Sequence, residues 1–210
     1  MTNNIIRSAI YGMLLGDSNF HSTKKKNKGI ACGHSLSQFN YLQHKVEILN
    51  TYLNSNNSIV EKTINSGYSL STRQPFYAYY SKTSHKINQF YSILCDGNDT
   101  KKRITEEGIN KYFTEVSLAY LFMDDGCKET VLNDNIRTIK SYKISLGSYT
   151  IDEVHFLNEV IYKRFNIVGK VYLEHQKYPC LKITTKINKL AFKTLLEPYL
   201  VDSMKYKLFV

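Results

Sequence analysis

Two aspartates stand at matching places in this chain, each at the end of an apolar run. The first run is IYGMLLGDS over residues 10–18 and the second is LAYLFMDDG over 118–126, so the acids are Asp17 and Asp125. Such runs favour helices, and the C-terminal end of a helix disfavours acid because it carries partial negative charge. A bound divalent cation would remove this penalty, since carboxylate and carbonyl oxygens are its preferred ligands.

The neighbours of these acids add candidate ligands and geometry. Gly16 precedes Asp17 and Asp124 precedes Asp125, and we count both as candidate metal ligands. Gly12 and Gly16 share one face of a helix, where glycine lets another backbone approach closely. If the two helices pack side by side, their carboxylates form a two-metal or shared-metal site for phosphodiester hydrolysis. The alternatives are a solvated acidic helix end and ordinary packing of two apolar helices.

The acids belong to a sequence that is written twice. Pro75 opens PFYAYYSKTSHKIN and Pro179 opens PCLKITTKIN, so the tripeptide KIN recurs at 86–88 and 186–188. Lys102 and Lys207 follow Asp17 and Asp125 at similar distances. Ordered landmarks at a nearly constant offset predict a duplicated module of roughly 100 residues. We therefore expect two domains, 1–100 and 101–210.

Each module must position its aspartate with the same elements, and the periodicity predicts α-β-β-α-β-β-α. The class is therefore α+β. Thr114 is expected to cap the second motif helix and Gly126 to follow it as a C′ residue. The expected elements are, in the first module, 4–16, 19–22, 30–38, 41–53, 68–72, 76–81 and 84–94, and in the second, 115–124, 137–147, 152–165, 171–174, 181–184 and 189–196.

The composition restricts the class of partner. The chain has 210 residues, of which 42% are hydrophobic, enough for a real core. Its net charge of +10 favours a polyanion such as nucleic acid, the alternative being a merely soluble basic protein. The four cysteines form no CxxC pair, so we expect free thiols in a reducing compartment. The start of the chain is read as neither a signal peptide nor a membrane span.

The two apolar segments resemble the LAGLIDADG motif of homing endonucleases. The segment 10–18 matches the motif at Gly12 and Asp17, and the segment 118–126 matches its first two and last two letters. The phrase SLAYLFMDDG, from Ser117, and the tail 198–208 are similar to the monomeric intron-encoded endonucleases of the omega type. The resemblance runs from about residue 8 to residue 208.

The resemblance implies a monomeric, site-specific endonuclease that cuts double-stranded DNA. In that family two pseudo-symmetric halves meet at the motif helices, and two antiparallel sheets form a DNA-binding saddle. The eighth motif position, here Asp17 and Asp125, binds catalytic Mg²⁺, and we expect Mn²⁺ to substitute. Lys102 and Lys207 correspond by position to lysines beside the scissile phosphates, where they polarise water or stabilise charge. A phosphate-backbone contact or plain surface charge remains the alternative for each lysine.

Two departures from the motif affect its glycines. Tyr120 replaces the first glycine and Ser18 replaces the last. We expect Tyr120 to make the helix packing wider or asymmetric. Neither change touches the aspartates, so the metal site is expected to survive.

Polar faces of the expected strands would suit a β-ribbon in the major groove, and the basic turn 24–28 would contact phosphates. A solvated strand face or loop is the alternative for each. The candidate DNA-binding residues are Lys24, Lys25, Lys28, Ser35, Ser37, Ser69, Ser71, Arg73, Tyr77, Tyr79, Arg137, Ser141, Lys143, Ser145, Lys182 and Thr184.

The expected activity is cleavage of a long target with short 3′ overhangs, promoting intron mobility. Three other functions stay open: an RNA-binding intron maturase, a catalytically inactive DNA-binding relative and a basic protein without nuclease function. No membrane partner is expected. The location would be an organelle, above all the mitochondrion, if the gene lies in a eukaryotic intron, and otherwise a bacterial or phage cytoplasm.

Overall fold

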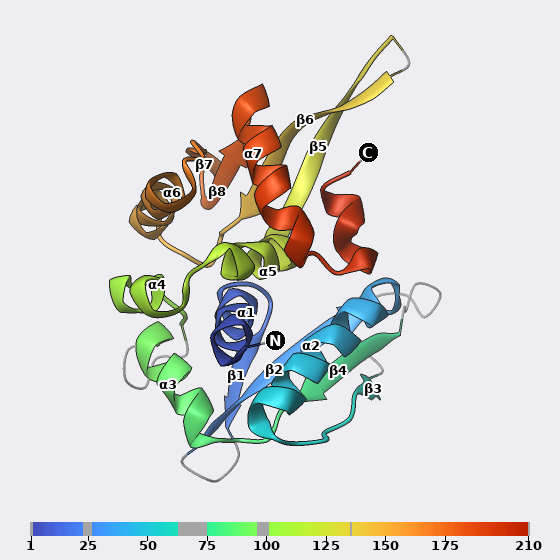
Figure 1. Ribbon diagram of the computed structural model, residues 1–210, viewed down its shortest axis with the longest axis vertical. Helices are drawn as coiled ribbons and strands as arrows, with labels where there is room; N and C mark the ends of the chain where they lie inside the picture. The colour runs from blue at the N-terminus through green and yellow to red at the C-terminus, as the bar shows by residue number, and fades with distance from the viewer. Residues whose placement is uncertain (1, 23–26, 63–74, 96–100, 135, 210) are drawn as a thin grey trace.

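The computed structural model describes residues 2–22, 27–62, 75–95, 101–134 and 136–209. Within these ranges the α-β-β-α-β-β-α pattern occurs twice, with one module below the other in Figure 1. Among the helices described, none has the length and apolar character that crossing a bilayer requires. All four cysteines lie in the described ranges and none of them forms a disulfide, as expected.

The N-terminal module follows the predicted order. Its elements are α1 (Asn3–Leu15), β1 (Asn19–Ser22), β2 (Lys28–Ser35), the 3₁₀ turn η1 (Leu36–Gln38), α2 (Phe39–Leu53), β3 (Val60–Lys62), β4 (Phe76–Tyr80) and α3 (His85–Leu94). The expected strand 30–38 was too long, because its last three residues form η1. The strand expected at 68–72 lies outside the described residues, and β3 takes the place beside β4.

The C-terminal module contains two elements for which the sequence patterns predicted no residue range. Its elements are α4 (Glu106–Tyr112), α5 (Glu115–Asp125), β5 (Gly126–Asn133), β6 (Ile136–Ser145), α6 (Ile151–Phe165), β7 (Lys170–Glu174), β8 (Tyr178–Ile183), α7 (Lys186–Leu196), and the 3₁₀ turns η3 (Glu197–Tyr199) and η4 (Asp202–Lys207). Helix α4 is an addition to the predicted pattern, whereas β5 is a strand of that pattern for which no residue range was predicted. Thr114 caps α5 as predicted, its side chain accepting from the Val116 N–H. Gly126 is not a C′ residue in the left-handed region, because it is extended and begins β5.

Each module folds one antiparallel sheet, and helices cover one of its faces. The strand orders are β1-β2-β4-β3 and β5-β6-β8-β7. Helices α2 and α3 pack on the first sheet, and α6 and α7 pack on the second (Figure 1). Residues alternate along a strand, so Ile30 and Cys32 of β2 are buried while Ala31 and Gly33 are only partly so. We call the side away from these helices the open face of each sheet.

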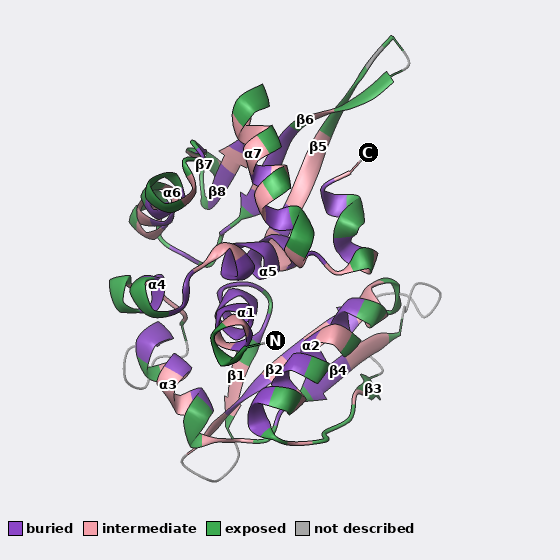
Figure 2. Cartoon of the chain, in the orientation of Figure 1, coloured by how far each residue is buried: buried purple, intermediate pink, exposed green. Residues whose placement is uncertain are grey.

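Helices α1 and α5 form the interface between the modules (Figure 2). A Cβ on Gly12 would lie 2.3 Å from the Ser117 carbonyl oxygen, and one on Gly16 would lie 2.5 Å from the Asp124 Cβ. The packing is asymmetric, as expected, because glycines of α1 face larger residues of α5. The Tyr120 hydroxyl is hydrogen-bonded to His44 Nε2 of α2 at 2.6 Å.

Gly12→Ala is expected to destabilise the protein by about 1–2 kcal/mol. Alanine raises helix propensity by about 1 kcal/mol, but overpacking against a fixed backbone typically costs about 1–3 kcal/mol. Urea unfolding measures the change. The control is Asn4→Ala in an exposed position of the same helix, which should not destabilise. Equal stabilisation by both substitutions would contradict the tight helix contact.

Candidate functional site

The helix interface brings the two motif aspartates to one place. Asp125 is the last residue of α5, and Asp17 lies just after α1. The two helix ends are joined directly, because the Asp17 N–H donates to Asp124 Oδ2 at 3.2 Å. Asp17 is exposed and Asp125 is partly buried. The site therefore has two carboxylates, one from each module, open to a ligand.

The protonation of the two acids reflects their closeness. Burial, followed by the charges of Asp17 and Asp124, raises the pKa of Asp125 to about 7, although Lys102 and Lys207 oppose the shift. The pKa of Asp17 is also raised, first by loss of solvent around the carboxylate and then by the charge of Asp124. Without further positive charge at the site, Asp125 therefore keeps its proton to a higher pH than an ordinary aspartate.

A divalent cation fits this donor set. Its charge would stabilise the ionised form of Asp125, which burial and then the charges of Asp17 and Asp124 disfavour, and hard cations prefer oxygen donors. No cluster of three or more His, Cys, Asp or Glu side chains that could hold a metal occurs in the described ranges. An ion here would therefore take Asp17 and Asp125 and complete its coordination with carbonyl, water or phosphate oxygens. The carbonyls nearest in sequence are those of Gly16 and Asp124.

Two lysines donate hydrogen bonds to the carbonyl groups at the C-terminal ends of the motif helices. Lys102 Nζ donates to the carbonyl oxygens of Gly16 at 2.6 Å and Ser18 at 2.9 Å. Lys207 Nζ donates to those of Met123 at 2.5 Å and Asp124 at 3.1 Å. Burial lowers the pKa of both ammonium groups. From the sequence, we expected a metal ion to compensate the negative charge of the two helix ends. In the structure, a lysine ammonium group lies at each helix end.

Asp124 has a structural role that was not predicted from the sequence. Its Oδ1 accepts from Lys45 Nζ at 2.6 Å, and both side chains are 0% exposed. Its Oδ2 accepts from the Asp17 N–H and its carbonyl oxygen accepts from Lys207 Nζ, so both groups that could serve the predicted metal role are already hydrogen-bonded. The sequence did contain a signal for the burial of Lys45. Lys45 follows Leu42 by three residues and Tyr41 by four, so it lies in the buried stripe of α2. A lysine in an apolar stripe requires a buried anion.

Metal-free Asp125→Asn is expected to lose less stability than wild type as pH rises. Between the ordinary Asp pKa of 3.8 and the folded value of about 7, the folded wild type binds more protons than the unfolded chain. The contribution of Asp125 to the free energy of unfolding of the wild type must therefore fall as the pH rises. After a discount for solvent screening, we expect the variant to gain about 2 kcal/mol on wild type between pH 5 and pH 8.

Urea unfolding in EDTA at those two pH values measures this difference. Taking the difference between variant and wild type cancels the titration of groups that both proteins share. Parallel pH profiles for the two proteins would show that Asp125 is not perturbed.

The open face of the C-terminal sheet holds several of the predicted DNA-binding residues. Lys143 and Lys182 are direct cross-strand partners there, and Ser145 is exposed beside them. Thr184 follows the end of β8 and is partly buried. Ser141 shares this face but is only 1% exposed and bonds Glu129, so its predicted display to DNA is wrong in this conformation.

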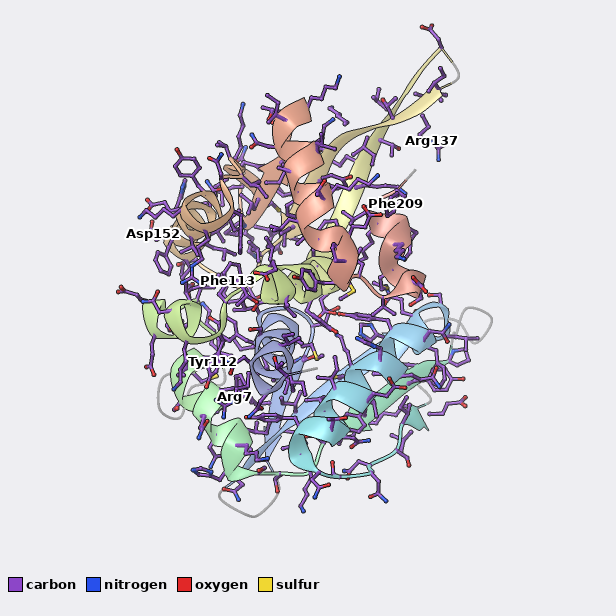
Figure 3. All side chains as sticks on the ribbon, in the orientation of Figure 1. Arg7, Tyr112, Phe113, Arg137, Asp152 and Phe209 are labelled. Carbon is purple, nitrogen blue, oxygen red and sulfur yellow. The ribbon has the colours of Figure 1, made fainter. Side chains whose placement is uncertain are left out.

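A β-bulge changes the predicted face of Arg137. Glu129 pairs with Ser141, but the next residue of β5, Thr130, pairs with Ile139. One residue of β6 is therefore unpaired, and the alternation reverses beyond it. Arg137 therefore points to the opposite face of the sheet from Lys143 and Ser145, contrary to the prediction. It lies near the far end of the β5–β6 hairpin (Figure 3).

The prediction also chose the wrong face of β4. Tyr79 is 0% exposed and donates to Asn50 of α2, while Tyr77 packs against Phe39 of the same helix. The open face carries Phe76, Ala78 and Tyr80 instead, in register with Ser35, Gly33 and Ala31. The stretch FYAYY is apolar in both alternations, so its period could not decide the face.

The remaining predicted contacts have mixed positions. Ser35 is on the open face, whereas Ser37 lies in η1 and bonds the Ser35 hydroxyl at 2.9 Å. Lys28 Nζ lies 4.3 Å from the centre of the Tyr91 ring of α3, on the helix-covered side. Outside the described residues lie Lys24, Lys25, Ser69, Ser71 and Arg73.

Comparison with known proteins agrees with this geometry. Residues 7–190 match the LAGLIDADG DNA endonuclease family. The chain is 27% identical to a cytochrome b mRNA maturase, bI2, of Saccharomyces cerevisiae, over 99% of its own length and 49% of the yeast protein. It is 29% identical to a probable intron-encoded endonuclease of Wickerhamomyces canadensis, over 97% of this chain and 84% of that protein. The chain thus spans about half of the first relative and most of the second.

A solved structure extends the agreement to the fold. The homing endonuclease I-WcaI, bound to its DNA recognition sequence, superposes with a TM-score of 0.81 at 24% identity. The match covers 99% of this chain and 87% of that one. The duplicated architecture around two motif helices is therefore shared with an endonuclease of known structure.

Proposed function

The chain belongs to the LAGLIDADG DNA endonuclease family, and on that premise we propose that it is a homing endonuclease that cuts both strands of one long DNA target. The observation that carries the proposal is the pair of carboxylates, Asp17 and Asp125, delivered by two modules to one open site. A lysine lies at the end of each motif helix, Lys102 on the Gly16 carbonyl and Lys207 on the Met123 carbonyl, and both act on the two acids. A duplicated site has one acid and one lysine for each strand of the duplex.

The residues divide the work of phosphodiester hydrolysis. Asp17 and Asp125 would hold Mg²⁺, which supplies Lewis acidity at the phosphate. Lys102 and Lys207 hold ammonium groups within reach of the two helix ends, where they can stabilise negative charge on a phosphate or orient water. The excess of basic residues, +10 in net charge, supports binding of the polyanion. We further propose short 3′ overhangs, a role in intron mobility and action as a monomer.

A maturase role is the second candidate function. It is favoured by the similarity to a protein named as a cytochrome b mRNA maturase. Retention of both aspartates argues against a catalytically inactive relative, but leaves room for cleavage and splicing activity in one chain. The intron-encoded endonuclease among the relatives supports a mitochondrial or other organellar location.

Cleavage of a randomised duplex library tests the proposed function. The protein is incubated with Mg²⁺, with Mn²⁺ and with EDTA, and the cut ends are sequenced. We expect one long family of sites cut on both strands with Mg²⁺ and Mn²⁺, short 3′ overhangs, and no cutting in EDTA. A protein that cuts no library member with either metal contradicts the proposal. Restored splicing of its own intron RNA would then favour the maturase.

A further inference from the structure

The open face of the C-terminal sheet carries two crossed ion pairs. Lys143 Nζ of β6 bonds Glu174 Oε1 of β7 at 2.9 Å, and Lys182 Nζ of β8 bonds Glu129 Oε1 of β5 at 2.8 Å. Each pair spans an intervening strand. Across the sheet, the order is glutamate, lysine, lysine, glutamate.

The register explains why these pairs exist. Lys143 and Lys182 are directly opposed in the β6–β8 ladder, an arrangement that like charges destabilise. A glutamate on each outer strand compensates. The hydrogen bond with Glu174 raises the pKa of Lys143, and that with Glu129 raises the pKa of Lys182, so both lysines stay charged at neutral pH. The Ser141 hydroxyl also donates to Glu129 and fixes its position.

A lysine held in such an ion pair binds the phosphate backbone of DNA less favourably than the edge of a suitable base pair. Binding a phosphate would take the lysine from its glutamate and leave the carboxylate near the polyanion. A G·C base pair can replace both partners, because guanine O6 and N7 accept from lysine and cytosine N4 donates to glutamate. The crossed pairs therefore favour G·C edges in the major groove over arbitrary backbone.

The N-terminal sheet lacks this arrangement within its described strands. Its open face carries small and aromatic residues, such as Gly33 and Tyr80, together with the lysine of β3, Lys62, which donates to the Tyr80 hydroxyl. The one glutamate of β3, Glu61, is in register with Tyr77 on the other face. The two open faces thus differ in chemistry, although the modules share one topology.

We propose that Glu129 and Glu174 are specificity-determining residues, which reserve Lys182 and Lys143 for G·C base pairs in the half of the target that the C-terminal sheet contacts. The inference rests on the proposed endonuclease function. It predicts a strong G·C preference in the half of the target that the C-terminal sheet contacts. It also predicts that the glutamates weaken binding to DNA of unrelated sequence.

Charge-matched variants test the glutamates. Glu129→Gln and Glu174→Gln each remove the negative charge beside one lysine. Glu159→Gln is the control, because it removes the charge of the exposed partner of Lys163 on α6 with the same change in net charge. Affinity for a 30-bp duplex of mixed sequence is measured by fluorescence anisotropy in EDTA over a range of KCl concentrations. The sheet variants should bind about 10-fold tighter at 0.1 M salt, with a slope of log K against log salt steeper by about 0.9, as expected for one added phosphate contact.

The same variants are then used in the library-cleavage assay. The sheet variants should lose about 10-fold of the G·C preference in one half of the selected sites, while Glu159→Gln keeps it. Sheet variants that match the control in affinity, salt slope and preference overturn the inference, and so does a wild type that cuts its sites without any such preference. In both cases the endonuclease proposal stands. It fails separately, if wild type cuts nothing.

Discussion

Asp17→Asn and Asp125→Asn are each expected to lower double-strand cleavage by at least about 10³-fold. Asparagine keeps the shape of the side chain but removes one of the two carboxylates that would hold the divalent ion. Transition-state stabilisation by such an ion contributes several kcal/mol, and each 1.36 kcal/mol corresponds to a factor of about ten in rate. Cleavage rates on the selected target, at saturating Mg²⁺ and with enzyme in excess, measure the loss.

Two controls separate this loss from misfolding or a general charge effect. The two variants should be at least as stable as wild type without metal, because each removes a carboxylate whose ionised form is disfavoured by burial and then by the neighbouring charges. Asp152→Asn changes an exposed acid at the start of α6, away from the helix interface (Figure 3), and should cut at the wild-type rate. Wild-type cleavage by either site variant would place the catalytic carboxylates elsewhere.

Lys45→Met is expected to destabilise the protein by about 3–5 kcal/mol, the usual consequence of removing one partner from a buried ion pair. The substitution leaves the Asp124 carboxylate fully buried without its cation, between α2 of one module and α5 of the other. It also removes the ammonium group that lies 4.6 Å from the centre of the Tyr41 ring. Urea unfolding at pH 7.5 in EDTA measures the loss.

An exposed ion pair provides the matched control for Lys45. Lys163→Met breaks the Lys163–Glu159 pair, whose side chains are 72% and 66% exposed, and should cost less than about 1 kcal/mol. The double variant Lys45→Met/Asp124→Leu should recover much of the stability, since replacing both partners removes the unpaired charge. If Lys45→Met costs no more than Lys163→Met, the ion pair does not hold the modules together.

The repeat was visible in the sequence because each landmark reports local chemistry. Apolar runs with helical spacing predicted α1 and α5, and the cap predicted at Thr114 is present. The order α-β-β-α-β-β-α was also correct within the described residues. Strand β5 and helix α4 were missed, because the charged segment GCKETVLN and the short segment EEGINKY have little apolar periodicity.

Which side chains of a strand lie on the open face depends on contacts with other elements, and the strand's own sequence does not determine it. The bulge near Glu129 reverses the facing of Arg137, and it arises from pairing with another strand. In β4, aromatic residues fill both alternations, so only the packing of α2 decides that Tyr79 is buried. Lys45 offered a signal in its helical position, but its partner Asp124 lies in the other module.

By itself, the sequence determined the duplication, the family and the two acids, since each depends on residue types at fixed local spacing. The tertiary structure alone decided which charges meet. It paired Lys45 with Asp124, placed Lys102 and Lys207 on the helix ends, and crossed the lysines of the C-terminal sheet with glutamates two strands away. The physical reason is that an ion pair forms between groups a few ångströms apart in space, and only the packing of helices and the register of strands fixes that distance.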